Sequence, residues 1–183
     1  YSSFFHSFYN LLIGMILILI TATPLLFKIL INDQYSGAYG LMAWLYVGVL
    51  FSSLVSFLGS IYVGEKRTKE VGVSSIIGAV INLAINLLLM KQFGVIVAAV
   101  STIASYFVIF IYRAKDIRKY VNVQYKYGVL ILGIGVVILL ALLNHSFTII
   151  TSIISLFITI GFNLIFNRII IIDILKKIVK RGR

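Results

Sequence analysis

FFHSFYNLLIGMILILITATPLLFKILI, residues Phe4–Ile31, decides the fold class, because Lys28 is the only charged side chain in these 28 residues. About 20 consecutive apolar residues let a helix cross the ~30 Å hydrocarbon core of a bilayer. The whole chain has the same character: of its 183 residues 61% are apolar and 11% are charged, and the mean hydropathy is +1.11. Soluble domains are roughly 45–50% apolar and about 25% charged. The excess apolar surface must face lipid, so the sequence predicts an all-α integral membrane protein.

Five further apolar runs follow this first one along the chain, each of roughly the length that a spanning helix needs. The six predicted spans are Phe4–Ile31, Ala38–Val63, Val71–Met90, Val95–Tyr112, Tyr127–Leu143 and Phe147–Phe166. We therefore expect four transmembrane helices in residues 1–112, a basic cytoplasmic loop at 113–126 and two further transmembrane helices in 127–166. Residues 167–183 alternate apolar and basic side chains, which predicts a basic amphipathic tail on the inner leaflet.

The basic residues are distributed very unevenly between the predicted loops. Of the 16 Lys and Arg residues, fourteen lie in the second loop, the fourth loop or the tail. In a chain with six spans, successive loops alternate sides, so these three segments all lie on the same side of the membrane. Only Lys28 and Lys91 fall on the other side. The positive-inside rule then makes the basic side, with the C-terminus, cytoplasmic. The net charge of +11 therefore reflects membrane topology rather than binding to nucleic acid. Because Tyr1 leads directly into a span, we expect the chain to be the C-terminal part of a longer protein.

Polar residues of the first span gather on one helix face. In chain order they are His6, Asn10, Gly14, Thr21 and Lys28. Their spacing by four or seven residues keeps them within about 80° of one another, and Pro24 at the edge of this face breaks the helix hydrogen bonding. If the face lines a hydrated cavity, Lys28 offers a positive charge to an anionic substrate. Alternatively, Lys28 reaches to the interface and the other residues pack against a neighbouring helix.

The third span carries two asparagines one turn apart, Asn82 and Asn86. In lipid, both side chains need hydrogen-bond partners, either on another helix or in a hydrated cavity. The candidate substrate-cavity residues are therefore Lys28, Asn10, Thr21, Asn82 and Asn86, with Pro24 as a helix break. The fifth span is almost purely aliphatic and glycine, and we expect it to be peripheral and to face lipid.

Catalytic chemistry has little support in this sequence. Cysteine is absent, and the five acidic residues, Asp33, Glu65, Glu70, Asp116 and Asp173, all lie in predicted loops or the tail. The chain contains neither a glycine-rich phosphate loop ending in Lys-Ser/Thr nor a His-Glu-x-x-His zinc helix. We therefore expect no enzyme activity, no metal and no cofactor.

Two stretches carry a resemblance to a known family: YVGEKRTK at Tyr62–Lys69, followed by Asn82, and FGVIVAAVSTIASY at Phe93–Tyr106. Both resemble the C-terminal half of bacterial polysaccharide, or oligosaccharide repeat-unit, flippases of the multidrug/oligosaccharidyl-lipid/polysaccharide exporter superfamily. Pro24, with Leu26-Phe27 and then Tyr35, is similar to the pattern with which the corresponding family helix ends. The resemblance covers roughly Phe5–Arg118.

The resemblance implies a two-lobed bundle with six helices in each lobe, sometimes followed by two extra helices. The present spans would then form the C-terminal lobe together with two terminal helices. The implied substrate is an undecaprenyl-pyrophosphate-linked oligosaccharide, turned from the inner to the outer leaflet of the bacterial inner membrane. The implied partners are membrane lipids, the N-terminal lobe, a polysaccharide polymerase and glycosyltransferases.

Three other functions remain open. An ion-coupled multidrug or small-solute antiporter of the same superfamily would be favoured by a buried carboxylate in the missing half. A membrane-bound glycosyl- or acyltransferase should show a catalytic His or Asp near a membrane face, a role that neither His6 nor His145 fills convincingly. A structural scaffold would leave the polar face of the first helix unexplained.

Overall fold

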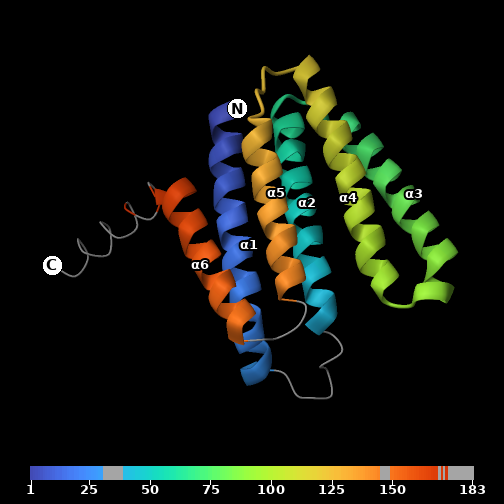
Figure 1. Ribbon diagram of the computed structural model, residues 1–183. Helices are drawn as coiled ribbons and strands as arrows, with labels where there is room; N and C mark the ends of the chain where they lie inside the picture. Colours follow the sequence, from blue (N-terminus) through green and yellow to red (C-terminus); the bar gives the residue numbers. More distant parts are fainter. Residues whose placement is uncertain (31–38, 145–148, 169, 171, 173–183) are drawn as a thin grey trace.

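The computed structural model describes residues 1–30, 39–144, 149–168, 170 and 172, and this part of the chain is almost entirely helical (Figure 1). The helices are α1 (Ser2–Leu30), α2 (Tyr39–Gly64), α3 (Thr68–Phe93), α4 (Ile96–Asp116), the 3-10 turn η2 (Ile117–Lys119), α5 (Tyr127–Leu143) and α6 (Ile149–Phe166). Each α-helix coincides with a predicted span. The tail predicted at 167–183 lies largely outside the described residues, as does His145.

Among the described residues, α1 to α4 are long and apolar enough to cross a membrane, whereas α5 and α6 are apolar but shorter. At 1.5 Å per residue, the 17 residues of α5 reach only about 26 Å. The chain is therefore a multi-pass α-helical membrane protein, and its described part contains four helices of full spanning length. A count of six spans stays a prediction.

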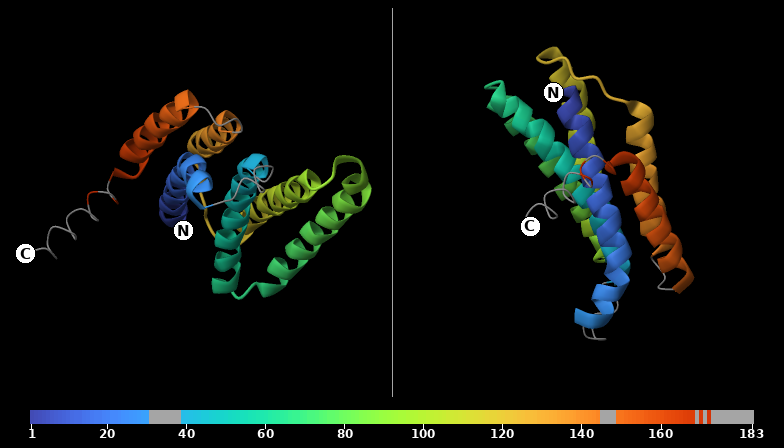
Figure 2. Two further views of the ribbon diagram at one scale, coloured as in Figure 1. Left: turned by 90° about the horizontal axis from the view of Figure 1, so that it is seen from below. Right: turned by 90° about the vertical axis from the view of Figure 1, so that its left-hand side faces the viewer.

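The helices form two groups that share α2 (Figures 1 and 2). In one group, α1 packs against α2, α5 and α6. In the other, α4 packs between α2 and α3, and α2 contacts α3 much less extensively than either helix contacts α4. Only Ser74 and Gly78 of α3 are buried, so nearly all of this helix faces outward.

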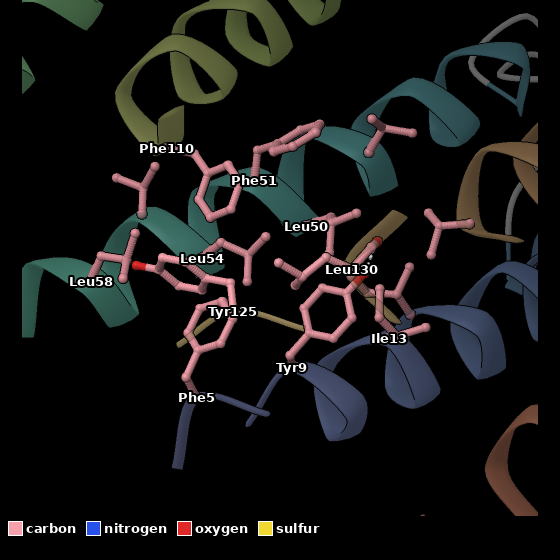
Figure 3. Close-up of a cluster of buried hydrophobic side chains, with 14 of the residues drawn as sticks. Phe5, Tyr9, Ile13, Leu50, Phe51, Leu54, Leu58, Phe110, Tyr125 and Leu130 are labelled. Carbon is pink, nitrogen blue, oxygen red and sulfur yellow. Dashed lines mark hydrogen bonds between the residues drawn. The ribbon is translucent and has the colours of Figure 1, made fainter. Parts of the chain in front are cut away.

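A cluster of buried side chains joins the two groups (Figure 3). Phe5, Tyr9 and Ile13 of α1 face Leu50 and Leu54 of α2, and all five are fully buried. Lipid tails are as apolar as these side chains, so association of the helices depends on close packing and interhelical hydrogen bonds. The residues at the contacts, small ones above all, therefore determine how closely two helices can pack against each other.

The fifth span is not peripheral, contrary to the expectation from its composition. One face of α5, including Leu130, Gly133 and Val137, is buried against α1 and α2. The Tyr9 hydroxyl donates a 2.6 Å hydrogen bond to the Leu130 carbonyl oxygen. A Cβ atom at Gly133 would lie 2.4 Å from that hydroxyl oxygen, so the glycine is what admits the tyrosine ring. A purely aliphatic sequence cannot distinguish this contact from contact with lipid.

The start of α1, the α2–α3 turn and the α4–α5 connection lie together at one end of the bundle (Figure 1). The Tyr1 hydroxyl donates to Glu65 Oε1 at 2.8 Å, and the Gln124 backbone N–H donates to Ser2 Oγ at 3.0 Å. This end, called the basic end below, carries Lys66, Arg67, Lys69, Lys115, Arg118, Lys119 and Lys126. The second and fourth loops therefore lie at the same end of the bundle, as the predicted topology requires.

The loop predicted at 113–126 begins inside a helix. Helix α4 continues one turn beyond Tyr112 to Asp116, and η2 extends it to Lys119. Arg113 is consequently a buried helix residue with 3% of its surface exposed, not a loop residue. Ser74 and Ser75 on α3 supply partners that make this position tolerable for a guanidinium.

Candidate functional site

A groove lined by both polar and apolar side chains lies between α2, α3 and α4 and is called the α3–α4 groove here. Its volume is about 450 Å³, and its lining residues are Val55, Ser75, Gly78, Ala79, Asn82, Thr102, Ser105, Tyr106 and Ile109. More than half of these residues carry a hydroxyl or an amide. Polar side chains inside a membrane are costly unless they meet hydrogen-bond partners or water. The groove therefore offers hydroxyl and amide groups to a polar substrate within spanning helices.

Gly78 brings α4 close enough to form the floor of the groove. A Cβ atom at this position would lie 2.2 Å from Ile109 Cδ1 and 2.7 Å from Ile109 Cγ1. Small residues at helix contacts let the backbones approach in this way. The close approach also places Ser105 of α4 opposite α3, where it is 5% exposed.

Amide and hydroxyl groups connect α3 to α4 beside the groove. The Asn86 amide donates to Ser101 Oγ at 2.7 Å, and also to the Asn82 side-chain oxygen at 3.1 Å. The Asn82 amide donates to Ser101 Oγ at 3.3 Å and to Thr102 Oγ1 at 3.5 Å. Asn82 thus has two roles: it joins α3 to α4 by hydrogen bonds, and it lines the groove.

Arg113 adjoins the groove through two of the groove's own residues. Its Nη1 donates to the Val55 carbonyl oxygen at 2.8 Å, and its Nη2 donates to Ser75 Oγ at 3.1 Å. Nε donates to Ser74 Oγ at 2.9 Å, and Nη2 donates to the Val71 carbonyl oxygen at 3.2 Å. A single guanidinium therefore fastens α2, α3 and α4 together with four hydrogen bonds.

All four acceptors of Arg113 are neutral. The carboxylate of Asp116, one turn away, instead accepts from the Tyr62 hydroxyl at 2.9 Å and from Lys119 Nζ at 2.7 Å. Within the described residues, no carboxylate forms an ion pair with Arg113. A guanidinium stays charged under all ordinary conditions, and its field extends far in a low dielectric. The end of the groove is thus electrostatically favourable for an anion.

Two of the candidate residues predicted on the first span, Asn10 and Thr21, lie elsewhere in the bundle, against α6 and the residue that follows it. Thr21 Oγ1 is 2.8 Å from Thr159 Oγ1, and the Asn167 amide donates to the Asn10 carbonyl oxygen at 2.9 Å. The Asn10 side-chain oxygen is buried without a hydrogen-bond partner. Pro24 is buried, and α1 continues through it to Leu30, so this proline does not end the helix. The Lys28 side chain lies outside the described residues, so the structure brings together only Asn82 and Asn86 of the predicted set.

Sequence reasoning missed Arg113, although a usable signal exists. The fourth span carries Ala98 and Ser101 or Thr102, followed by Ser105, as small residues at steps of about four. Two more steps of four from Ser105 reach Ile109 and then Arg113, on the same helix face. A basic residue that continues the four-residue spacing of small residues on one helix face is therefore better assigned to the helix than to the loop that follows it.

The chain is similar to part of a known membrane protein. An uncharacterized membrane protein of Methanocaldococcus jannaschii is 31% identical to the chain over 111 residues. These residues are 60% of this chain but only 22% of the archaeal protein, so the match spans less than a quarter of that relative. No family model and no solved structure matches the chain. The comparison agrees with the fold in making this chain similar to part of a larger membrane protein.

Proposed function

We propose that this chain is part of a flippase that moves an undecaprenyl-pyrophosphate-linked oligosaccharide from the inner to the outer leaflet. The observation that carries the proposal is the α3–α4 groove, a partly polar surface within spanning helices that adjoins a buried cation. A sugar needs hydroxyl and amide partners on its way through the membrane, and a diphosphate needs positive charge. The groove offers the first through Ser75, Asn82 and Thr102. The buried Arg113 guanidinium does not line the groove, but it donates to Ser75 and so contributes a positive field beside it rather than a direct contact.

The proposed location is a bacterial inner membrane, with the basic end and the C-terminus in the cytoplasm. The unequal distribution of Lys and Arg supports this orientation. Proposed partners are membrane lipids, the N-terminal lobe of the same transporter, a polysaccharide polymerase and glycosyltransferases. The length of the archaeal relative agrees with a segment that belongs to a longer protein.

An ion-coupled antiporter has less support from the described residues. Cation and proton sites in transporters rest on carboxylates within the membrane. No acidic residue lines the α3–α4 groove. Glu65 and Glu70 lie at the α2–α3 turn, where the first accepts from Tyr1 and the second from Arg67.

The proposed function is tested by deleting the full-length gene in its own organism. We expect surface polysaccharide to disappear and the lipid-linked repeat unit to accumulate on the cytoplasmic leaflet, measured by extraction and by accessibility to an added glycosidase. The intact gene should restore export, and a gene with Ala79→Leu should not, because Ala79 lines the groove and a leucine fills it. Val80→Leu, one residue along on the outward face, is the matched control. Unchanged surface polysaccharide and an unchanged lipid-linked pool in the deletion strain would refute the proposal.

Lys28 provides a second test of charge compensation. If it meets the pyrophosphate at the other end of the path, Lys28→Arg should retain much of the export, since an ammonium acts as a point charge without bidentate geometry. Lys28→Gln should lose most of the export at unchanged protein level. Equal export by the two variants would instead mean that Lys28 only reaches the interface.

A further inference from the structure

A second hollow lies at the basic end, outside the α3–α4 groove. The connection between α4 and α5 curves around a volume of about 580 Å³, lined by Arg118, Lys119, Tyr120, Val121, Asn122, Val123, Gln124 and Tyr125. Hydrogen bonds of Ser2 Oγ with the Gln124 backbone N–H and the Asn122 carbonyl oxygen hold this connection against the start of α1. The hollow is thus a fixed feature of the bundle end, called the end hollow below.

Aromatic rings hold Arg118 in place at the rim of the end hollow. Its guanidinium carbon lies 5.0 Å from the centre of the Tyr125 ring and 5.6 Å from that of the Tyr127 ring, and Nη2 donates to the Tyr127 hydroxyl. A guanidinium stacked on aromatic rings loses less freedom when it binds an anion. Tyrosines are also typical of the membrane–water interface, so we expect the end hollow to lie near the depth of lipid headgroups.

The charge of the end hollow is positive. Within the described part of the chain, ion pairs join Lys119 to Asp116 and Arg67 to Glu70, and no carboxylate pairs with Arg118. The Lys119 side chain is 71% exposed and lines the hollow while it pairs with Asp116, so Arg118 is the cation of the hollow that no described carboxylate offsets. Burial raises the pKa of Tyr125 to about 12, although Arg118 acts in the opposite direction. The phenol therefore stays neutral at physiological pH and does not offset the cations.

We propose that the end hollow binds the phosphate group of an anionic phospholipid, with Arg118 and Lys119 as its cationic ligands. The side-chain amides of Asn122 and Gln124, which also line the hollow, can donate to the same phosphate. Anionic lipids of the cytoplasmic leaflet attract basic residues at this depth. The site needs no transported substrate, so it stands independently of the flippase proposal.

Hydrogen–deuterium exchange of the full-length protein in nanodiscs tests this site. We expect the segment 118–126 to exchange more slowly in nanodiscs that contain phosphatidylglycerol than in phosphatidylcholine alone. Arg118→Gln and Lys119→Gln should each weaken the lipid dependence about fivefold in a phosphatidylglycerol titration. Arg118→Lys should retain part of it, because it keeps the charge. Lys69→Gln is the matched control, since Lys69 is exposed at the same end but does not line the hollow.

Hydrogen–deuterium exchange of peptides from α2 reports whether each variant remains folded, because this helix packs against members of both helix groups. Inorganic pyrophosphate added to phosphatidylcholine nanodiscs distinguishes a lipid site from a site for soluble phosphate. Protection by pyrophosphate equal to that by phosphatidylglycerol would overturn the assignment to a lipid. The absence of any difference between the two nanodisc compositions in the wild-type protein would overturn the site itself.

Discussion

Arg113→Ala is expected to lower the free energy of unfolding by about 2–4 kcal/mol, because it removes four hydrogen bonds that join three helices. Interhelical hydrogen bonds in membranes contribute about 0.6 kcal/mol each on average, and acceptors left buried without a donor add to the loss. Helix α3 has only two buried residues of its own, so it should be the first helix to separate. The melting temperature of the full-length protein in detergent, followed by size-exclusion chromatography after heating, measures this effect.

Lys115→Ala is the matched control for Arg113→Ala, since Lys115 is a basic residue on the same helix that is exposed. It should leave the melting temperature nearly unchanged. Arg113→Lys should fall between the two, because an ammonium has three N–H donors and cannot reproduce the planar geometry that reaches α2 and α3 together. A melting temperature of Arg113→Ala equal to that of Lys115→Ala would show that the guanidinium does not hold these helices together.

Gly78→Val should have the second-largest effect, because the added side chain collides with Ile109 at the floor of the α3–α4 groove. A Cβ atom alone would approach Ile109 Cδ1 to 2.2 Å, and the branches of valine leave that side chain no room to turn aside. Overpacking of this kind costs about 1–3 kcal/mol. We expect α3 to move away from α4 and the hydrogen bond from Asn86 to Ser101 to weaken.

A double-mutant cycle with Ile109→Ala checks this explanation. The smaller residue should make room for the valine, so that Gly78→Val costs much less in the Ile109→Ala background. Gly72→Val provides the control on the same helix, because a Cβ atom at Gly72 meets no other atom within 4 Å. A loss of stability at Gly78 that persists unchanged in the Ile109→Ala background would contradict the proposed collision.

The positions of the helices could be predicted because apolar length is a local property of the sequence. The packing partners could not, since they depend on which faces meet in space. The stripe with Gly14 and Thr21 on α1 could face a cavity or another helix, and only the arrangement of α1 beside α6 provides Thr159 as a partner. For the same reason, the aliphatic α5 gave no sign that Tyr9 packs against Gly133.

The sequence indicates two polar residues of this region but not the groove itself. The sequence identified Asn82 and Asn86 as polar groups that need partners, and the structure supplies Ser101 and Thr102. Arg113 was assigned to the loop because a charge at the edge of a hydrophobic run usually marks its end. Here the helix continues, and acceptors on α2 and α3, distant in sequence, make burial of the charge possible.

Water accessibility within the membrane most directly decides whether the α3–α4 groove carries a polar substrate. Because this chain contains no cysteine, single cysteines can be placed at Ala79, which lines the groove, and at Val80, which is 61% exposed on the outward face at nearly the same depth. In the full-length protein freed of other cysteines, a membrane-impermeant methanethiosulfonate reagent should label Ala79→Cys rapidly and Val80→Cys barely. The lipid-linked oligosaccharide should slow labelling of Ala79→Cys. Equal and negligible labelling at both positions would show that the groove is filled by lipid, and would contradict its role in transport.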